Sequence, residues 1–493
     1  MLRAASAAAL AGLGEVPRAA WLCALVGCVC AVAWSIVTPP FNAPDEPVHF
    51  AYVKQLAETG RLPVGSNSKF SLEEEVALAD LRLEVVAEDP QNRTISSRAQ
   101  QQRLQGDLDR YRGPPEAGRE FAGVAASQPP LYYAIEAIPY ELGASGTLLD
   151  RLELMRLLSA VMCGLTALFA FMFVREALPA APWSWTVGGL GVALEPLLGF
   201  VSGTVNPDAL LFAVSGAAFY CLARGFRRGL TRRLAIVLGA VTAVGFATKL
   251  NFLGLAPGVL LGLILLSVRA ARDGSGRAAY LSLAIGLSIA LSPVLLYVLL
   301  HVASGGHTLG IVSSGILDTH GSPFAEASYI WQLYLPRLPG MHDYFAGLQT
   351  TRQLWFDHIV GLYGWLDTPF PSWVENLALL PAAIVAGLCL RSLVIGRASL
   401  IARRTELLVY CVMVLGLMVL IGADSYLGFP KVNAEYAQAR YLLPVVPLLG
   451  LVYALCARAA GRRWGPALGA LLIMGFLAYE IASQLQVVAR FYG

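Results

Sequence analysis

The chain of 493 residues contains 56% hydrophobic and only 14% charged residues, and its mean hydropathy is +0.60. Soluble proteins average about a quarter charged residues, so this composition excludes an ordinary soluble protein and predicts a chain that lies mostly in a membrane. The net charge of +3 gives no indication of a nucleic-acid partner. All 8 cysteines fall within apolar runs, so the sequence contains no disulfide framework and no cysteine-based metal motif.

Apolar runs long enough to cross a bilayer, which takes about 20 residues, occur eleven times. We therefore predict an all-α polytopic membrane protein with about eleven transmembrane helices, in which residues 1–493 form a single transmembrane domain. The first run has no small-residue cleavage site after it, which favours a membrane span over a signal peptide. The runs cover about residues 19–37, 153–174, 182–202, 207–223, 234–250, 252–268, 279–300, 376–395, 405–422, 441–457 and 464–482.

The arginines predict the orientation, because they concentrate in alternate connections between the apolar runs. One such connection contains Arg224, Arg227, Arg228, Arg232 and Arg233, and four others are similarly basic. The positive-inside rule assigns these connections and the N-terminus to the cytoplasm. We thus expect a multi-pass protein of the cytoplasmic membrane with the C-terminus outside. The segments predicted to lie outside are 38–151, 301–375 and 423–440.

The segment 39–50, which reads Pro-Pro-Phe-Asn-Ala-Pro-Asp-Glu-Pro-Val-His-Phe, follows the first span directly. Its adjacent acids, Asp45 and Glu46, are costly to bury near hydrocarbon unless water, a cation or a substrate compensates them. This placement indicates a functional site. The alternative is that one of the acids caps a helix whose first turn contains Pro47.

The rest of the first outer segment has helical patterns. Apolar residues at helical spacing follow Pro47 and stop at Gly60, which predicts a helix lying at the membrane interface. Residues 71–112 mix acidic and basic residues, as a solvated helical face does. The sequence from Gln128 to Tyr133, Gln-Pro-Pro-Leu-Tyr-Tyr, predicts a second amphipathic helix that returns the chain to the membrane.

Further polar residues stand at the predicted outer ends of the spans. Lys249 and Arg440 are cations on the side that the charge rule disfavours. Each could be a membrane anchor that extends to the headgroups, or part of one site with the acids. The second outer segment contains five of the six histidines without metal-binding spacing, and His342 in it is a polar loop residue or a substrate contact. The remaining candidates are Asn206, Asp208, Gln438 and Tyr441.

These features together resemble the GT-C superfamily, whose members are polytopic glycosyltransferases that use polyprenyl-phosphate-linked sugars. The resemblance rests on the acid pair in the first outer segment, the interfacial helix, the Pro-Pro-Leu-Tyr-Tyr segment and the many spans that follow. The 39–50 string is more similar to a bacterial family of membrane proteins of unknown function within that clan. The resemblance implies a GT-C-like bundle, a polyprenyl-phosphate sugar donor and a cell-envelope acceptor, with an inverting reaction on the outer face.

The resemblance also implies roles for individual residues. Asp45 matches the base that activates the acceptor, and Glu46 would orient it or help to hold a divalent cation, Mg²⁺ or Mn²⁺, in members that use one. Arg440 matches the cation beside the carrier phosphate, and Lys249 fits the same role. Better-known members often carry a histidine where this chain has Gln128. The other residues expected to contact substrate are His49, Gln128, Tyr132, Asn206, Asp208, His342, Gln438 and Tyr441.

Two other functions are compatible with the sequence. A flippase for lipid-linked sugars would carry charged residues near the bilayer midplane, where Glu195 is the chief polar residue. A polymerase of envelope polysaccharides would share the donor chemistry. Because the polar residues gather at the outer ends of the spans, the sequence favours a catalytic cavity that opens to one side.

Overall fold

The computed structural model describes residues 16–63, 68–89, 91–94, 97–111, 125, 127–303, 322–432 and 437–493. His307 and His320 of the second outer segment lie outside these ranges. Helices dominate the described residues, and two short strands form one antiparallel pair in which Leu362 faces Pro369.

Each of the eleven predicted apolar runs coincides with a helix or with the bent pair α9 and α10. Their bounds are α2 (Arg18–Val37), α8 (Leu148–Ala177), α9 (Pro182–Ala193), α10 (Pro196–Ser202), α11 (Asp208–Arg228), α12 (Arg232–Thr248), α13 (Phe252–Ala270), α14 (Gly276–Ala303), α17 (Ser372–Ile395), α19 (Arg404–Val432), η4 (Ala439–Val445), α20 (Val446–Arg458) and α21 (Gly461–Tyr492).

By length and composition, eight helical segments of the described chain can cross a membrane, or nine if α9 and α10 count as one broken span. The higher number, nine, is lower than eleven for two reasons. The helix α12 has only 17 residues, and α13 with α14 counts as one apolar segment. The chain nevertheless turns at Ala271–Ser275, where Gly274 has a φ of +102°, and α14 packs back against α12 and α13. The prediction of an all-helical, multi-pass membrane protein is confirmed.

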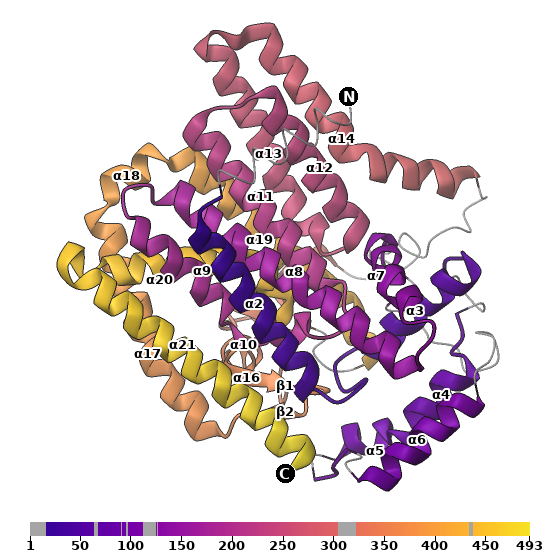
Figure 1. The fold of residues 1–493 in the computed structure, drawn as a ribbon. Helices are drawn as coiled ribbons and strands as arrows, with labels where there is room; N and C mark the ends of the chain where they lie inside the picture. Colours follow the sequence, from indigo (N-terminus) through magenta and orange to yellow (C-terminus); the bar gives the residue numbers. More distant parts are fainter. Residues whose placement is uncertain are drawn as a thin grey trace.

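The bundle is organised around α8, which packs against α2, α9 and α11. Figure 1 shows α2 lying along α8, with α17, α20 and α21 on one side and α12, α13 and α14 on the other. Close helix contacts depend on small residues. A Cβ atom added to Gly188 of α9 would lie 2.7 Å from the carbonyl oxygen of Gly450 in α20, so neither helix can carry a larger residue there without moving.

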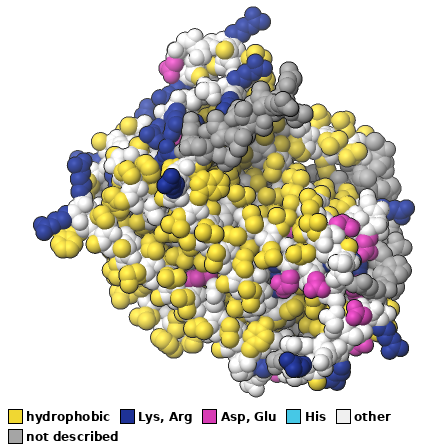
Figure 2. Space-filling view, viewed as in Figure 1, with side chains coloured by type: hydrophobic (Ala, Val, Ile, Leu, Met, Phe, Trp, Pro, Cys, Tyr) yellow, Lys and Arg dark blue, Asp and Glu magenta, His cyan; other side chains and the backbone are white. Residues whose placement is uncertain are grey.

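Exposed apolar side chains cover the flanks of the bundle. Leu25 and Ile36 of α2 are 60% and 71% exposed, and Leu471 and Met474 of α21 are 64% and 68% exposed. Figure 2 shows hydrophobic side chains over the middle of this face, while arginines and lysines gather at its edges. Large exposed apolar areas of this kind match a lipid-facing surface.

The remaining elements belong to the two long predicted outer segments and to two short connections. In the first outer segment, α3 ends at Gly60, whose φ is +66°, as the sequence predicted. The bounds are α3 (Glu46–Thr59), α4 (Leu72–Asp80), α5 (Leu83–Glu88), α6 (Arg98–Arg110), α7 (Leu131–Leu142), η2 (Ala271–Ser275), α15 (Pro323–Tyr334), η3 (Gln353–Asp357), α16 (His358–Gly361), β1 (Leu362–Tyr363), β2 (Thr368–Pro369) and α18 (Arg397–Ala402).

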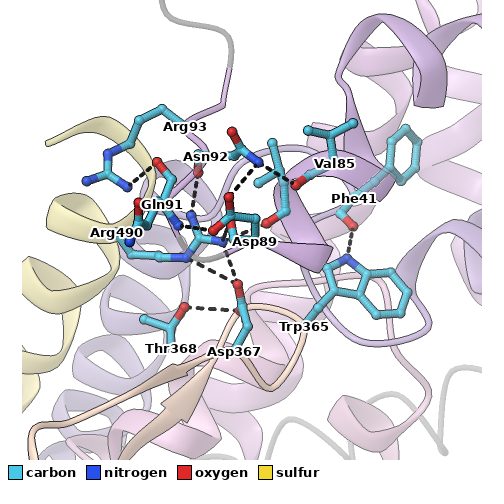
Figure 3. Close-up of polar contacts among 11 residues, drawn as sticks. Phe41, Val85, Asp89, Gln91, Asn92, Arg93, Trp365, Asp367, Thr368 and Arg490 are labelled. Atoms are coloured by element: carbon cyan, nitrogen blue, oxygen red, sulfur yellow. Dashed lines mark hydrogen bonds and ion pairs between the residues drawn. The ribbon is translucent and has the colours of Figure 1, made fainter.

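Arg490 joins three distant parts of the chain, as Figure 3 shows. This residue near the end of α21 forms a 2.6 Å ion pair with Asp367, beside β2. Its guanidinium also donates to the carbonyl oxygens of Val86 and Asn92, each at 2.6 Å. Two residues before Asp367, the Trp365 indole donates to the carbonyl oxygen of Phe41 at 3.0 Å. The C-terminal helix and the β hairpin thereby support the segment that leads to the acid pair.

We expect the Arg490→Gln variant to unfold at a lower temperature than the wild type, because it leaves Asp367 nearly buried without its cation. Breaking a buried pair in this way destabilises by about 3–5 kcal/mol. Unfolding of the purified protein in detergent measures the effect. The matched control is Arg462→Gln at the other, exposed end of α21. Equal unfolding temperatures for both variants would show that Arg490 does not anchor the outer segment.

Candidate functional site

The adjacent acids Asp45 and Glu46 point toward different partners. Asp45 stands just before α3 with a left-handed backbone, φ 66° and ψ 0°, and Glu46 is the first residue of the helix. Aspartate tolerates this conformation better than most residues do. Asp45 occupies the capping position, but its side chain makes no capping hydrogen bond. The capping role considered from the sequence is therefore not observed.

Glu46 is fully buried in a bidentate ion pair with Arg156 of α8, which is also fully buried. The guanidinium donates to both carboxylate oxygens at 2.8 and 2.7 Å, and the backbone N–H of Val205 donates to one of them at 3.0 Å. Arg156 also donates to three carbonyl oxygens at the end of α2 and just after it: those of Ser35, Thr38 and Pro39. Glu46 therefore has the environment of a residue that holds the fold together, with no face toward a substrate.

Asp45 forms an ion pair with Arg440 of η4, across 395 positions of sequence. The distance between Oδ2 and the guanidinium nitrogen is 2.7 Å, and the two side chains are 28% and 5% exposed. Burial is the largest single effect on the pKa of Asp45 and acts to raise it, but the charge and hydrogen bond of Arg440 together with smaller contributions, among them that of Lys249, hold the pKa below its usual value. Asp45 is thus an ionised carboxylate that remains accessible from one side.

Lys249 and Asp208 form a second ion pair beside the first. Lys249 follows α12, Asp208 begins α11, and their charged atoms are 2.8 Å apart in a buried position. The ring of Tyr441 joins the two pairs, because the Lys249 ammonium lies 5.7 Å and the Arg440 guanidinium 5.4 Å from its centre. The structure therefore brings both predicted cations and both predicted aspartates into one cluster.

A cavity of ≈ 230 Å³ lies against this cluster. Arg440 and Gln438 form its polar wall, and Arg440 Nε and Gln438 Oε1 are buried polar atoms without a hydrogen-bond partner. Buried donors and acceptors are normally satisfied, so these two atoms suit a bound polar group. The rest of the lining consists of Pro44, Leu197, Phe200, Val201, Gln349, His358, Leu362, Leu366, Ala437 and Ala439.

His49 is a buried residue in the first turn of α3, close to Asp45. It is 2% exposed, and its Nδ1 lies 3.0 Å from the hydroxyl of Tyr133, whose ring stacks on Tyr52 with centres 3.6 Å apart. Burial lowers the pKa of His49 to about 3, although Asp45 acts in the opposite direction. A neutral imidazole in this position fixes the first turn of α3 and supplies no positive charge.

The structure places the other predicted residues as follows. Gln128 accepts a 3.3 Å hydrogen bond from the backbone N–H of Leu250, which positions the turn that carries Lys249. Asn206 accepts from the N–H of Asp208 at 3.0 Å, and the hydroxyl of Tyr132 lies 2.9 Å from that of Ser159. The hydrogen bonds of Gln128, Asn206 and Tyr132 are thus made to other groups of the protein near the site.

His342 is exposed and packs against Tyr344, with ring centres 4.8 Å apart. The contacts described for it place it with α15 rather than with the ion-pair cluster, because its carbonyl oxygen accepts a hydrogen bond from Gln332. The structure thus does not bring His342 to the cluster that contains Asp45.

The acid pair does not fit a divalent cation. Asp45 is neutralised by Arg440 and Glu46 by Arg156, so each carboxylate already has a positive partner. Across the part of the chain that the structure describes, no three His, Cys, Asp or Glu side chains gather closely enough to hold a metal ion.

Three residues of the site were not identified from the sequence. Arg156 lies inside an apolar run, and a charged residue in such a run indicates an oppositely charged partner buried in the protein. Tyr133 was visible only as part of the Pro-Pro-Leu-Tyr-Tyr segment. His358 lines the cavity from α16, and burial lowers the pKa of its imidazole. No local pattern in the sequence distinguishes His358 from the other histidines of the second outer segment.

A comparison with protein families gives one match over most of the chain. The family model described as "Predicted membrane protein (DUF2142)" matches residues 28–449, a range that contains all the residues of the ion-pair cluster. No curated protein matches the chain.

Solved membrane-protein structures show a distant similarity. ArnT from Cupriavidus metallidurans in the apo state is 13% identical with a TM-score of 0.46, and the alignment covers 88% of this chain and 59% of that one. The same protein bound to undecaprenyl phosphate is 14% identical with a TM-score of 0.46, and the alignment covers 90% of this chain and 60% of that one. The oligosaccharyltransferase of Archaeoglobus fulgidus in the apo form is 10% identical with a TM-score of 0.45, and the alignment covers 96% of this chain and 56% of that one. The chain spans less than two thirds of the length of each.

Glu46 and Glu153 both lie close to Arg156, and we expect their substitutions to differ in their effect on stability because only Glu46 is buried. Glu46→Gln leaves a buried guanidinium without a full counter-charge, so we expect it to lower stability by about 3–5 kcal/mol. The matched control is Glu153→Gln, since Glu153 lies 3.5 Å from the same arginine but is 45% exposed. An exposed pair contributes about 0–1 kcal/mol. Thermal unfolding in detergent compares the two, and an undiminished stability of Glu46→Gln would contradict a structural role.

Proposed function

The chain belongs to the DUF2142 family of membrane proteins, and we propose that it transfers a sugar from a polyprenyl-phosphate carrier to an acceptor of the cell envelope. The proposal rests on the ion pair between Asp45 and Arg440, because Arg440 also lines the ≈ 230 Å³ cavity. A carboxylate beside a guanidinium that lines a cavity provides the two groups that sugar transfer from a phosphate needs: a proton acceptor and a phosphate partner.

The cavity lining supports an amphiphilic donor. Its polar wall contains Arg440 and Gln438, while α10 contributes Leu197, Phe200 and Val201. A phosphate suits the first wall, because arginine offers several N–H donors in a planar arrangement and the Nε of Arg440 is unpaired. An isoprenoid chain suits the apolar wall that α10 contributes.

The cations have a role in bond cleavage. When the acceptor oxygen attacks the anomeric carbon, the bond from that carbon to the phosphate oxygen breaks and the carrier phosphate gains negative charge. Arg440 and Lys249 lie on the ring of Tyr441 and can stabilise this charge together. The ion pair with Asp208 holds Lys249 in place for this contact. A single displacement of this kind inverts the anomeric configuration.

Asp45 has the role of proton acceptor. The acceptor hydroxyl loses its proton to the carboxylate as the new glycosidic bond forms. Arg440 lowers the pKa of Asp45 and so weakens it as a base before the donor binds. A donor phosphate competes for the same guanidinium, and its arrival would free the carboxylate and restore its basicity. Donor binding would in this way activate the base.

The location of the reaction follows from the charge distribution. The basic connections predict that the end of the bundle with Asp45 faces away from the cytoplasm. Polyprenyl-linked sugars are used there by the GT-C enzymes that the 39–50 segment resembles. The donor sugar is therefore proposed to be one that reaches the outer face of the cytoplasmic membrane on its carrier.

One observation favours transport of a lipid-linked sugar as a second candidate function. The pair α9 and α10 is bent by 55°, and Glu195 stands at the break, 4% exposed. Broken helices with buried polar residues line the binding sites of many transporters. Proteoliposomes that contain a fluorescent polyprenyl-phosphate sugar separate the two functions, since a transporter moves the intact lipid and a transferase cleaves it.

We expect Asp45→Asn to lower the rate of sugar transfer by about 10²–10⁴-fold, which is the usual contribution of a positioned base. The asparagine keeps the size of the side chain and tolerates the left-handed backbone, so the protein should stay folded. The measurement uses purified protein in proteoliposomes with a panel of synthetic polyprenyl-phosphate hexoses and pentoses and an envelope fraction as acceptor.

The matched control is Asp343→Asn, an exposed aspartate of the second outer segment that pairs with Arg337. This variant should transfer at the wild-type rate. Full activity of Asp45→Asn with any donor that the wild type uses would remove Asp45 from the mechanism. Wild-type protein that cleaves no donor but moves intact lipid across the bilayer would favour the transport function.

A further inference from the structure

A second cavity, of ≈ 590 Å³, lies at the opposite end of the bundle. The helices α11 and α13 begin beside the ion-pair cluster, at Asp208 and Phe252, and their last turns line this cavity. Since α11 has 21 residues, its ends are about 30 Å apart, the thickness of a bilayer core. The cavity is therefore separate from the site of sugar transfer.

Arginines dominate the polar lining of this cavity. Arg227, Arg269, Arg272 and Arg403 line it, against the acids Asp273 and Glu406. Arg227 and Arg403 are held in place by contacts with Glu176 and with carbonyl oxygens at the end of α8. Figure 2 shows basic side chains along the upper and upper-left edge of the molecule.

The other arginines of the cavity are exposed. Arg269 has a side chain that is 60% exposed, and one of its terminal nitrogens donates to the carbonyl oxygen of Phe226 at 3.1 Å. Its Nε lies 3.9 Å from Asp273, a separation at which an exposed pair contributes little. Arg272 is also exposed, and it forms no ion pair with a described residue. These two arginines are thus available to an anion from outside the protein.

The cavity also has apolar walls and a helix start. Phe226, Leu265 and Val268 contribute its apolar side, and Thr405 belongs to the first turn of α19. Backbone N–H groups in the first turn of a helix have no partner within the helix and attract anions. The lining thus combines positive charge with hydrophobic surface at a predicted membrane boundary, which suits a phosphate attached to acyl chains better than a free ion.

We propose that this cavity binds the headgroup of an anionic phospholipid, with the phosphate between Arg269, Arg272 and the start of α19 and the acyl chains along α13. Basic pockets between membrane helices bind anionic headgroups in this way, and each arginine near the surface contributes about 1 kcal/mol. The bound lipid would fix the ends of α11, α13 and α19 relative to one another. The proposal does not depend on the sugar-transfer activity.

Native mass spectrometry of the full chain in detergent tests the proposal with phosphatidylglycerol and phosphatidylcholine of identical acyl chains. We expect phosphatidylglycerol to bind more tightly. Loss of one arginine should weaken its binding about five-fold, and the double variant Arg269→Gln/Arg272→Gln about thirty-fold. The double variant should bind phosphatidylcholine as the wild type does, which also shows that it is folded.

The matched control is Arg232→Gln/Arg233→Gln, at the exposed start of α12 outside the cavity. Its affinity for phosphatidylglycerol should stay within about two-fold of the wild type. An equal loss in the control would show general attraction to a basic surface and refute a site in the cavity. Displacement of the lipid by inorganic phosphate at equal concentration would refute the lipid and assign the cavity to a free phosphate. Unchanged lipid binding in the double variant would refute both.

Discussion

The buried ion pair between Glu46 and Arg156 is the contact on which the arrangement of the site depends. It connects the start of α3, the end of α2, the first third of α8 and the turn before α11. Because Glu46 is held inward and Asp45 has a left-handed backbone, the Asp45 carboxylate is directed to the other side, toward Arg440. One acid of the pair thus fixes the geometry in which the other meets Arg440, which lines the cavity.

The sequence predicted the features that depend on local composition. The apolar runs predicted the long helices, and Gly60 predicted the end of α3. The position of the two acids after the first span indicated a site. The sequence left open whether Lys249 and Arg440, at the outer ends of spans, are membrane anchors or part of one site with Asp45. Both cations lie on Tyr441 in the structure, and neither has the setting of a membrane anchor, since they are 7% and 5% exposed.

The sequence could not predict which acid pairs with Arg440 beside the cavity, because this depends on contacts between distant residues. Glu46 and Arg156 are 110 positions apart, and nothing near either residue indicates the other. The same holds for the wall that α10 and His358 contribute to the cavity. The lower number of candidate spans has a local cause. The helix α12 is short, and only the five residues Ala271–Ser275 separate α13 from α14, so that the two helices form one continuous apolar segment by length and composition.

The central claim is that a donor phosphate and Asp45 compete for Arg440. Binding of undecaprenyl phosphate to the purified wild type, Asp45→Asn and Arg440→Lys tests it most directly. If the claim is correct, Asp45→Asn binds the lipid phosphate about ten-fold more tightly than the wild type, since a hydrogen bond to a charged group is worth about 1.5 kcal/mol. Arg440→Lys binds it more weakly, because lysine lacks the planar set of donors. Unchanged or weaker binding by Asp45→Asn would contradict the claim.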